Sequence, residues 1–148
     1  MLRILLIEDN PADAQMLQTS LLKTGVPIEI IRIENGEKAI EYLAAASPCC
    51  DIVLLDLNLP RVSGLEVLEY IRSRKELKSL PVIIMSGSTD TVEIDRCYQA
   101  GANSYICKPI YLDEILSTAA ALVTYWSKCV RLPSKPLAPR FLAATQSK

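Results

Sequence analysis

Ile52-Val-Leu-Leu-Asp-Leu-Asn-Leu-Pro60 begins with four aliphatic residues, which are followed directly by the carboxylate of Asp56. Its first four residues are apolar without alternation, which is typical of a strand covered on both faces of a parallel sheet. Pro60 and Ser63-Gly64 predict a loop beyond it. Ligands of open α/β sheets bind outside the carboxyl ends of the strands. Asp56 is therefore a candidate functional residue, although an Asp at a strand exit is also common as turn chemistry or as a helix cap.

The rest of the chain shows similar apolar runs that alternate with helical patterns. Apolar runs predict strands over residues 2–7, 28–33, 52–56, 81–86 and 104–107. Helical spacing predicts helices after Pro11, from Asn35-Gly36, from Gly64, over about residues 91–100 and from Leu112 through Trp126. Because strands alternate with helices five times, we expect a single α/β domain with a parallel sheet and right-handed crossovers.

The domain is expected to cover residues 1–127, followed by a C-terminal extension over residues 128–148. The extension has no sustained periodicity and contains three prolines, which predicts an extended or flexible segment: Pro133, Pro136 and Pro139. We expect no output domain after the α/β domain and no signal peptide before it.

Composition limits the classes of function. The 148 residues are 50% hydrophobic but only 5% aromatic, which favours an aliphatic core. The net charge is −1, from 16 basic and 17 acidic residues, so neither a nucleic-acid-binding surface nor a membrane-binding basic segment is expected. No apolar run approaches the roughly 20 residues of a transmembrane helix. We therefore expect a cytoplasmic protein that contacts neither nucleic acid nor membrane.

The chain has no histidine and five cysteines, at positions 49, 50, 97, 107 and 129. The absence of histidine excludes a histidine-based zinc site and the Ser-His and Cys-His nucleophiles. An odd number of cysteines with no Cys-x-x-Cys pair argues against a fold built on disulfides. Cys107 lies inside an apolar run and is expected to be a small core residue.

Polar residues follow four of the predicted strands, and parallel strands end at the same edge of a sheet. That edge is expected to gather five side chains: Glu8, Asp9, Asp56, Ser86 and Lys108. Three uncompensated carboxylates repel one another, and Mg²⁺ (or Mn²⁺) relieves the repulsion. A cation, a hydroxyl and an ammonium group together suit a phosphoryl group. Asp56 is the candidate nucleophile, because a carboxylate can form an acyl phosphate.

These residues, in this order and spacing, resemble the receiver domain of two-component response regulators. The resemblance covers about residues 1–127. It implies a flavodoxin-like, doubly wound five-stranded sheet of order 2-1-3-4-5 with five helices. It also implies that Asp56 accepts a phosphoryl group from the phosphohistidine of a sensor histidine kinase. Mg²⁺ would be held by Asp9, Asp56 and the backbone carbonyl of Asn58, with Glu8 acting through water.

The resemblance further implies how a signal leaves the site. Ser86 and Tyr105 would be the switch pair: Ser86 moves toward the phosphoryl group, and Tyr105 rotates inward behind it. This change would reshape the surface of the fourth helix, fifth strand and fifth helix. Lys108-Pro109 is expected to have a cis peptide bond. The protein would thus be a phosphoacceptor in signalling rather than an enzyme.

The end of the last predicted helix and the residues after it extend beyond a minimal receiver. In this respect the chain is similar to the stand-alone regulators partnered with phytochrome-type histidine kinases of bacteria and cyanobacteria, which form dimers through the fourth and fifth helices. Trp126, Val130 and Leu132 would supply an apolar patch for such a homodimer. The alternative is that these side chains fold back on their own sheet.

Three other functions remain as alternatives. A pseudo-receiver would act as an interaction module without phosphorylation, but the acidic, hydroxyl and lysine positions are all present. A haloacid-dehalogenase-type phosphatase also uses an Asp nucleophile with Mg²⁺, but it needs a second Asp two residues later, where this chain has Asn58. Nucleotide binding is disfavoured because no glycine-rich phosphate loop follows the first strand.

Overall fold

The computed structural model describes residues 1–45 and 50–134 and contains one five-stranded parallel sheet of order β2-β1-β3-β4-β5. The strands are β1 (Leu2–Ile7), β2 (Ile28–Ile33), β3 (Ile52–Asp56), β4 (Val82–Ser86) and β5 (Ser104–Cys107). The α-helices are α1 (Pro11–Leu22), α2 (Gly36–Ala45), α3 (Gly64–Ser73), α4 (Thr91–Gln99) and α5 (Leu112–Thr124). A 3₁₀ turn (Lys75–Leu77) follows α3, and a π-helical turn (Tyr125–Cys129) extends α5. The predicted fold class and strand order are confirmed.

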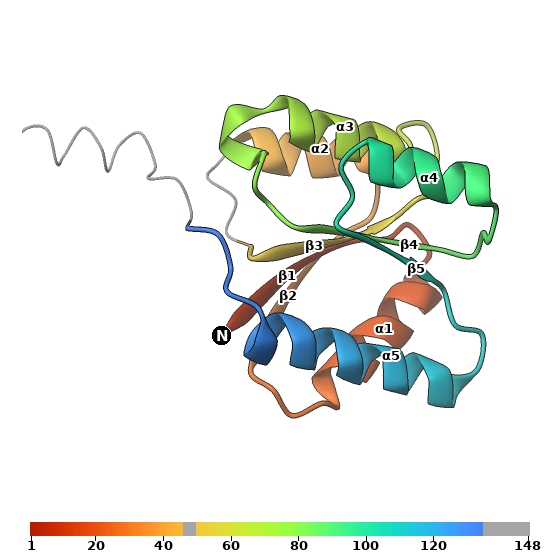
Figure 1. Ribbon diagram of the computed structural model, residues 1–148. Coiled ribbons are helices and arrows are strands. Elements are labelled where there is room, and N and C mark those ends of the chain that lie inside the picture. Colours follow the sequence, from red (N-terminus) through yellow and green to blue (C-terminus); the bar gives the residue numbers. More distant parts are fainter. Residues whose placement is uncertain (46–49, 135–148) are drawn as a thin grey trace, which may run out of the picture.

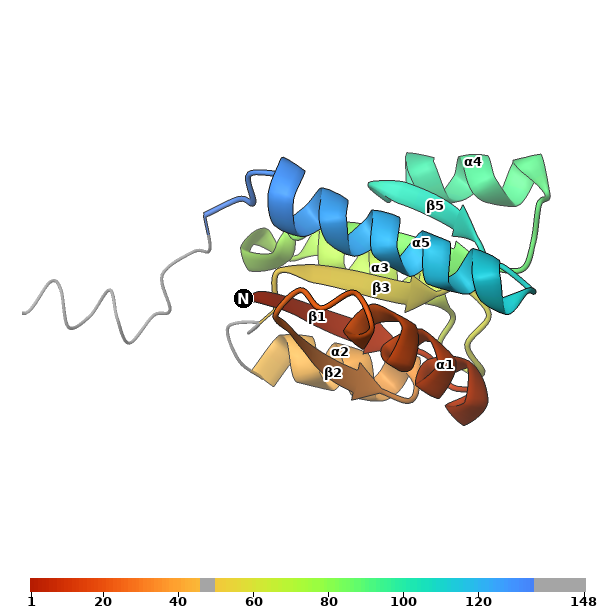
Figure 2. The same ribbon diagram turned by 90° about the horizontal axis from the view of Figure 1, so that it is seen from below.

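The sheet separates two layers of helices. α2, α3 and α4 cover one face, and α1 and α5 cover the other (Figures 1 and 2). Each face has its own aliphatic core, and every residue of β3 and β4 is buried. Strands buried on both faces explain why their sequences read as continuous apolar runs.

Local sequence fixes where the helices begin and end. The Asn10 side chain accepts hydrogen bonds from the backbone N–H groups of Ala12 and Asp13, at 2.9 and 3.1 Å, and so caps α1. Ser63 caps α3 in the same manner, and Asp90 caps α4. After α1, Gly25 adopts a φ of +78°, a conformation that favours glycine. These side-chain caps fix the starts of α1, α3 and α4, each of which follows a strand.

β5 differs from the central strands because it lies at the edge of the sheet and pairs only with β4. None of its four residues is fully buried. The prediction that Cys107 is a core residue was therefore wrong: its side chain is exposed, with Sγ 3.7 Å from the carbonyl oxygen of Ser88. An apolar run of four residues does not distinguish an edge strand from a central one.

The predicted cis bond between Lys108 and Pro109 was also wrong, since the described residues contain no cis peptide bond. The trans form is intrinsically favoured at X–Pro by about 0.5–1 kcal/mol. In this form the Lys108 N–H already donates to the carbonyl of Ser86 at 2.7 Å.

The end of α5 turns back toward the domain. Trp126 and Leu132 are partly buried against the core between the sheet and α1 and α5. Within one chain, these two side chains therefore pack on their own sheet, which was the alternative to a dimer patch. Val130 is also partly buried, and its N–H donates to the carbonyl of Tyr125 at 3.0 Å. Cys49, Pro136 and Pro139 lie outside the described residues, so the predicted extended tail beyond residue 134 stays a prediction.

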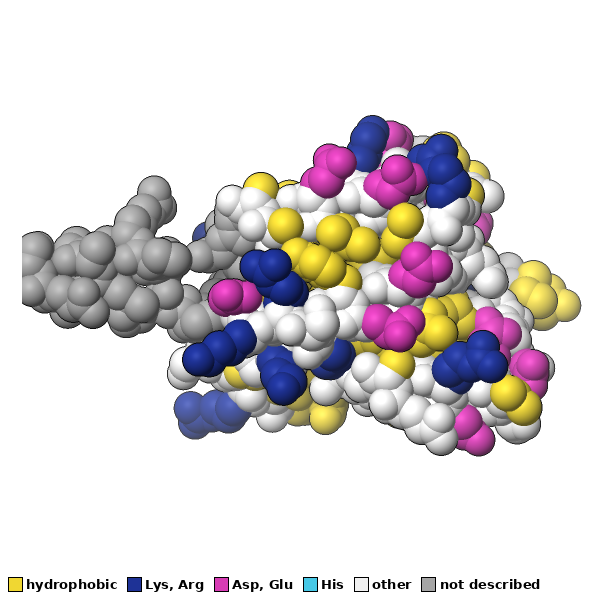
Figure 3. Space-filling view, turned by 90° about the horizontal axis from the view of Figure 1, so that it is seen from above, with side chains coloured by type: hydrophobic (Ala, Val, Ile, Leu, Met, Phe, Trp, Pro, Cys, Tyr) yellow, Lys and Arg dark blue, Asp and Glu magenta, His cyan; other side chains and the backbone are white. Residues whose placement is uncertain are grey.

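The outer surface of α2, α3 and α4, the upper layer of helices in Figure 1, carries both apolar and charged side chains. Apolar side chains form a broken band along the middle of the face over α2, α3 and α4, and both acidic and basic side chains border it (Figure 3). No helix within residues 1–45 and 50–134 is long and apolar enough to cross a membrane.

Candidate functional site

Two central strands bring three carboxylates together at the carboxyl edge of the sheet. β1 and β3 are parallel neighbours; Glu8 and Asp9 follow β1, and Asp56 ends β3. One carboxylate oxygen from each of the three residues lies within 4.8 Å of the other two. Glu8 and Asp56 are only 4% and 5% exposed. The structure thus assembles the acidic cluster that the strand-end pattern predicts.

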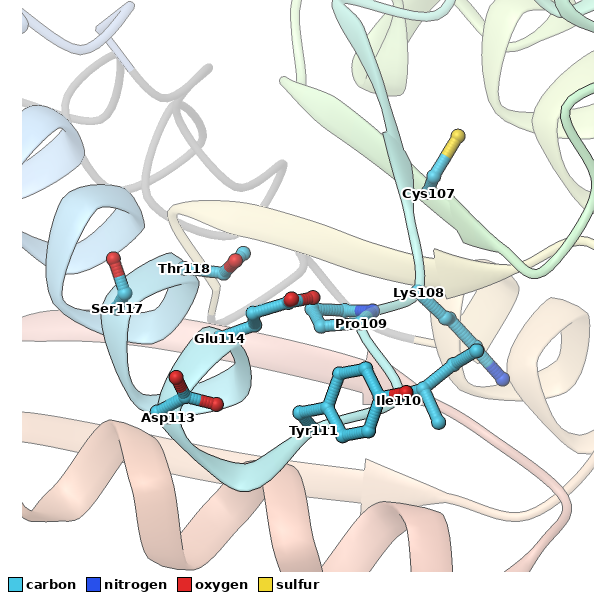
Figure 4. Close-up of a pocket in the computed structure, with 9 residues that line it drawn as sticks. All are labelled: Cys107, Lys108, Pro109, Ile110, Tyr111, Asp113, Glu114, Ser117 and Thr118. Atoms are coloured by element: carbon cyan, nitrogen blue, oxygen red, sulfur yellow. The ribbon is translucent and has the colours of Figure 1, made fainter.

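Lys108 bridges the two buried carboxylates. Its Nζ lies 2.7 Å from Oε1 of Glu8 and 3.3 Å from Oδ1 of Asp56, and Oδ2 of Asp13 is 3.8 Å away. Its side chain leaves the end of β5 in a different direction from that of Cys107 (Figure 4). One ammonium group therefore offsets part of the charge of several carboxylates, and the remaining negative charge favours a cation.

The crowding of charge shows in the pKa values. Burial, together with the hydrogen bond and negative charge of Asp56, raises the pKa of Glu8 from 4.5 to about 7, although Lys108 opposes the shift. For Lys108, burial lowers the pKa, but its hydrogen bond to Glu8 and the charges of Asp56 and Glu8 outweigh burial and raise it overall. Near neutral pH the lysine therefore remains charged, whereas Glu8 is close to its titration midpoint.

Ser86 and the loop after it form the hydroxyl side of the site. Ser86 is the last residue of β4, is fully buried and pairs in register with Cys107 of β5. Its Oγ accepts a hydrogen bond from the backbone N–H of Ser88 at 3.2 Å. The side chain therefore reaches the same edge of the sheet as the carboxylates, as the sequence predicts.

Tyr105 holds the β4–α4 loop and α4 through two hydrogen bonds. Its hydroxyl donates to the carbonyl of Ser88 at 2.8 Å, and its backbone N–H donates to the hydroxyl of Tyr98 at 3.1 Å. The ring is partly buried against the core between the sheet and α2, α3 and α4, and burial raises the pKa of its hydroxyl. The inward rotation of Tyr105 stays a prediction, because the structure shows a single position.

The turn after β3 fixes the Asp56 carboxylate. The backbone N–H of Asn58 donates to Oδ1 of Asp56 at 3.3 Å. This bond orients the oxygen that also faces Lys108. The use of the Asn58 carbonyl as a metal ligand stays a prediction.

Sequence reasoning missed several residues around the site. The Arg32 guanidinium donates to the backbone carbonyls of Glu8 and Asp9, Asp13 reaches toward Lys108, and Tyr98 holds Tyr105. Arg32 had a signal in the sequence, since it interrupts the apolar strand Ile28–Ile33. The Tyr98 contact had none, because a tyrosine on a helix does not reveal which backbone group it will meet.

Open space adjoins Asp56 and Lys108. The end of β5 and the start of α5 border an open hollow of about 550 Å³ beside Lys108 (Figure 4). A second cavity of about 300 Å³ runs from Asp56 and Lys108 between α1 and α5, where aliphatic side chains such as Leu17 and Ile115 line it. Asp56 is thus largely buried yet borders space that another group can enter.

Comparisons with known proteins agree with this geometry. Residues 4–120 match the family model of the response regulator receiver domain. The chain is 31% identical over 136 residues to "Response regulator Rcp1" of Synechocystis, covering 88% of this chain and 92% of that protein. It is 33% identical over 134 residues to "Probable methanogenesis regulatory protein FilR2" of Methanothrix harundinacea, covering 88% and 86%.

Solved structures give the same result. The phosphorylated cyanobacterial phytochrome response regulator RcpA superposes with a TM-score of 0.83 at 35% identity, covering 89% of this chain and 98% of that one. The Mn²⁺-bound form of response regulator Rcp1 superposes with a TM-score of 0.83 at 30% identity, covering 90% and 100%.

Proposed function

Because this chain belongs to the response regulator receiver domain family, we propose that it accepts a phosphoryl group on Asp56 from the phosphohistidine of a partner histidine kinase. The observation that carries the proposal is the contact of Lys108 with both Glu8 and Asp56, at 2.7 and 3.3 Å. A cationic side chain that already touches the candidate acceptor is suited to pair with a phosphoryl oxygen there.

The donor set fits a hard divalent cation. Three carboxylates share one edge of the sheet with a single ammonium group, and Mg²⁺ prefers one or two carboxylates, carbonyl oxygens and water. Asp9, Asp56 and the Asn58 carbonyl would bind Mg²⁺ or Mn²⁺, with Glu8 acting through water. When bound, the metal neutralises phosphoryl oxygens and the acceptor carboxylate during transfer.

The residues of the chain supply the remaining chemistry. An oxygen of Asp56 forms a bond to phosphorus while the bond from phosphorus to the donor nitrogen breaks, and the electron pair stays on the imidazole. Lys108 pairs with a phosphoryl oxygen, and the Ser86 hydroxyl donates to another. The buried setting of Asp56 strengthens both interactions.

The structural effect of the added phosphoryl charge would reach the surface through the residues that contact it. Phosphorylation replaces the single negative charge of the Asp56 carboxylate with the roughly two charges of an acyl phosphate, and only contacts that differ between two states can shift their populations. Movement of Ser86 toward the phosphoryl group would disturb the β4–α4 loop, to which Tyr105 is bound through Ser88. The α4–β5–α5 surface is therefore the proposed output.

The partners are proposed from the similarity to known response regulators. The similarity to a cyanobacterial phytochrome response regulator favours a phytochrome-type sensor kinase in the cytoplasm. A homodimer through the α4–β5–α5 side would use Trp126 at the end of the domain, together with Val130 and Leu132 of the extension over residues 128–148. Since Trp126 and Leu132 already pack on their own core, they would offer a dimer only their exposed edges.

Intact-mass spectrometry tests the acceptor. With Mg²⁺ and an acyl phosphate as donor, the wild-type protein should gain one phosphoryl group, and Asp56→Asn should gain none. Asp95→Asn, which changes an exposed Asp on α4, is the matched control and should behave as wild type. Modification of Asp56→Asn to the same extent as wild type would refute the assignment.

Size-exclusion chromatography with light scattering tests the output. Beryllofluoride with Mg²⁺, a mimic of the phosphoryl group, should change the mass or shape of wild type but not of Asp56→Asn. No beryllofluoride binding and no phosphorylation would favour the pseudo-receiver, an interaction module independent of phosphate.

A further inference from the structure

Arg32 occupies an unusual place on β2. Alternate residues of a strand point to the same face, and Ile28 and Ile30 pack against the core beneath α1 and α5. Arg32 continues this row at the carboxyl end of the strand, where it is half-buried and lies in register with Leu6 of β1. A charged residue in an otherwise aliphatic row needs a partner for its guanidinium.

That partner is the backbone that carries two of the three carboxylates. Nη2 of Arg32 donates to the carbonyl oxygen of Glu8 at 2.9 Å, and Nε donates to the same oxygen at 3.3 Å. Nη2 also reaches the carbonyl oxygen of Asp9 at 3.4 Å. On the adjacent peptide unit, the Glu8 N–H donates to the carbonyl of Ile33 at 3.1 Å.

The turn after β1 is thus tied to the edge strand β2 on both sides of Glu8. Without such a constraint, repulsion between the carboxylates of Glu8, Asp9 and Asp56 would favour a turn in which they separate. A planar guanidinium fixes a carbonyl with two donors, which a lysine ammonium does not do. We infer that Arg32 is a positioning residue for the metal site: it holds the Glu8–Asp9 turn so that both carboxylates face Asp56.

The inference rests on the proposed function, and it makes a prediction opposite to that of simple electrostatics. If Arg32 acted only as a positive charge near a cation site, its removal would strengthen Mg²⁺ binding, and lysine would replace it fully. If Arg32 positions the turn, removing its donors weakens Mg²⁺ binding even though a repulsive charge is lost. The sign of the change therefore separates the two roles.

Calorimetric titration of the full chain with Mg²⁺ is the test, with Arg32→Gln removing the charge and Arg32→Lys keeping it. Both variants should bind Mg²⁺ about tenfold more weakly than wild type, the scale seen when residues that orient metal ligands are removed. Arg3→Gln and Arg3→Lys are matched controls, because Arg3 is exposed near the opposite end of β1, and they should match wild type.

Urea unfolding in a chelator, followed by the single tryptophan Trp126, separates positioning from a loss of fold. Should Arg32→Gln not fold, the better-tolerated Arg32→Lys decides the question. Wild-type affinity in both variants, or tighter binding by Arg32→Gln with no change in Arg32→Lys, would overturn the inference and leave the proposed function intact. Failure of wild type to bind Mg²⁺ would overturn both.

Discussion

Gly64 packs against the backbone of Asp56, the proposed phosphoryl acceptor, and its replacement by alanine tests how the site is built. A Cβ atom at this position would lie 2.2 Å from the carbonyl oxygen of Asp56 and 2.7 Å from Cα of Leu57. Both are backbone atoms of the turn that leaves β3, and the Gly64 N–H donates to the carbonyl of Leu57 at 3.0 Å. No side-chain rotation can relieve such a contact, so either the turn or the start of α3 must move.

The structure gives the scale of the effect. Overpacking of this kind costs about 1–3 kcal/mol, and loss of the hydrogen bond adds about 1 kcal/mol. The smaller chain entropy of alanine in the unfolded state returns about 0.4–1 kcal/mol. We therefore expect Gly64→Ala to lower the free energy of unfolding by about 1–4 kcal/mol. Because the displaced atoms belong to Asp56 and Leu57, phosphorylation should slow as well.

Gly87 is the matched control. It follows β4 as Gly64 follows the turn after β3, but a Cβ atom there would meet nothing within 4 Å. Gly87→Ala should keep or slightly raise stability, by up to about 1 kcal/mol. Urea unfolding followed by Trp126 fluorescence measures both variants under the same conditions. Equal stability of the two would show that the turn yields without cost and would refute the reasoning.

Two further predictions follow from other parts of the structure. In metal-free protein, the raised pKa of Glu8, about 7, means that the folded state holds a proton that the unfolded state releases near pH 4.5. Stability should therefore fall as pH rises from about 4.5 to 7, by on the order of 3 kcal/mol. Since the chain has no histidine to titrate in this range, Glu8→Gln should flatten urea-unfolding stability measured from pH 5 to pH 7.5, and an unchanged slope would contradict the assignment. Far from the site, Arg72 donates to the carbonyls of Gly101, Lys78 and Leu80 and to the Asn103 side chain. Arg72→Met should cost about 2–4 kcal/mol in the same assay, whereas Arg74→Met, which loses an exposed ion pair with Glu76 at 3.5 Å, should cost less than about 1 kcal/mol; equal losses would refute the role of Arg72.

The positions of the central strands could be predicted because the sequence of each strand shows its burial directly. β3 and β4 are covered on both faces, so their sequences are uninterrupted aliphatic runs with clear ends. The same reasoning failed at Cys107, because the burial of an edge-strand residue depends on what covers the edge, and no local pattern records that. The Lys108-Pro109 bond was mispredicted for another reason: the cis form was expected from the resemblance to receiver domains, whereas the dipeptide itself favours trans.

The site shows the same division between local and tertiary information. Glu8, Asp9, Asp56, Ser86 and Lys108 could be placed together because parallel strands end at one edge. The contacts of Arg32 and Tyr98 could not be predicted, since both side chains act on backbone groups of other elements. The sequence marks Arg32 only as a charged residue within an apolar strand, and the backbone groups that such a side chain binds become visible only in the folded chain.

The two halves of the site differ in how firmly they are built. The carboxylates stand on β1 and β3, central strands that are paired on both sides, and Glu8 and Asp56 are almost entirely buried. Tyr105 and Lys108 belong to or follow β5, an edge strand of four residues with no fully buried member. Local opening is cheapest where few buried contacts must be broken. If Asp56 is phosphorylated as proposed, we therefore expect the carboxylates to stay in place and the edge strand, the β4–α4 loop and α4 to be the parts that change position.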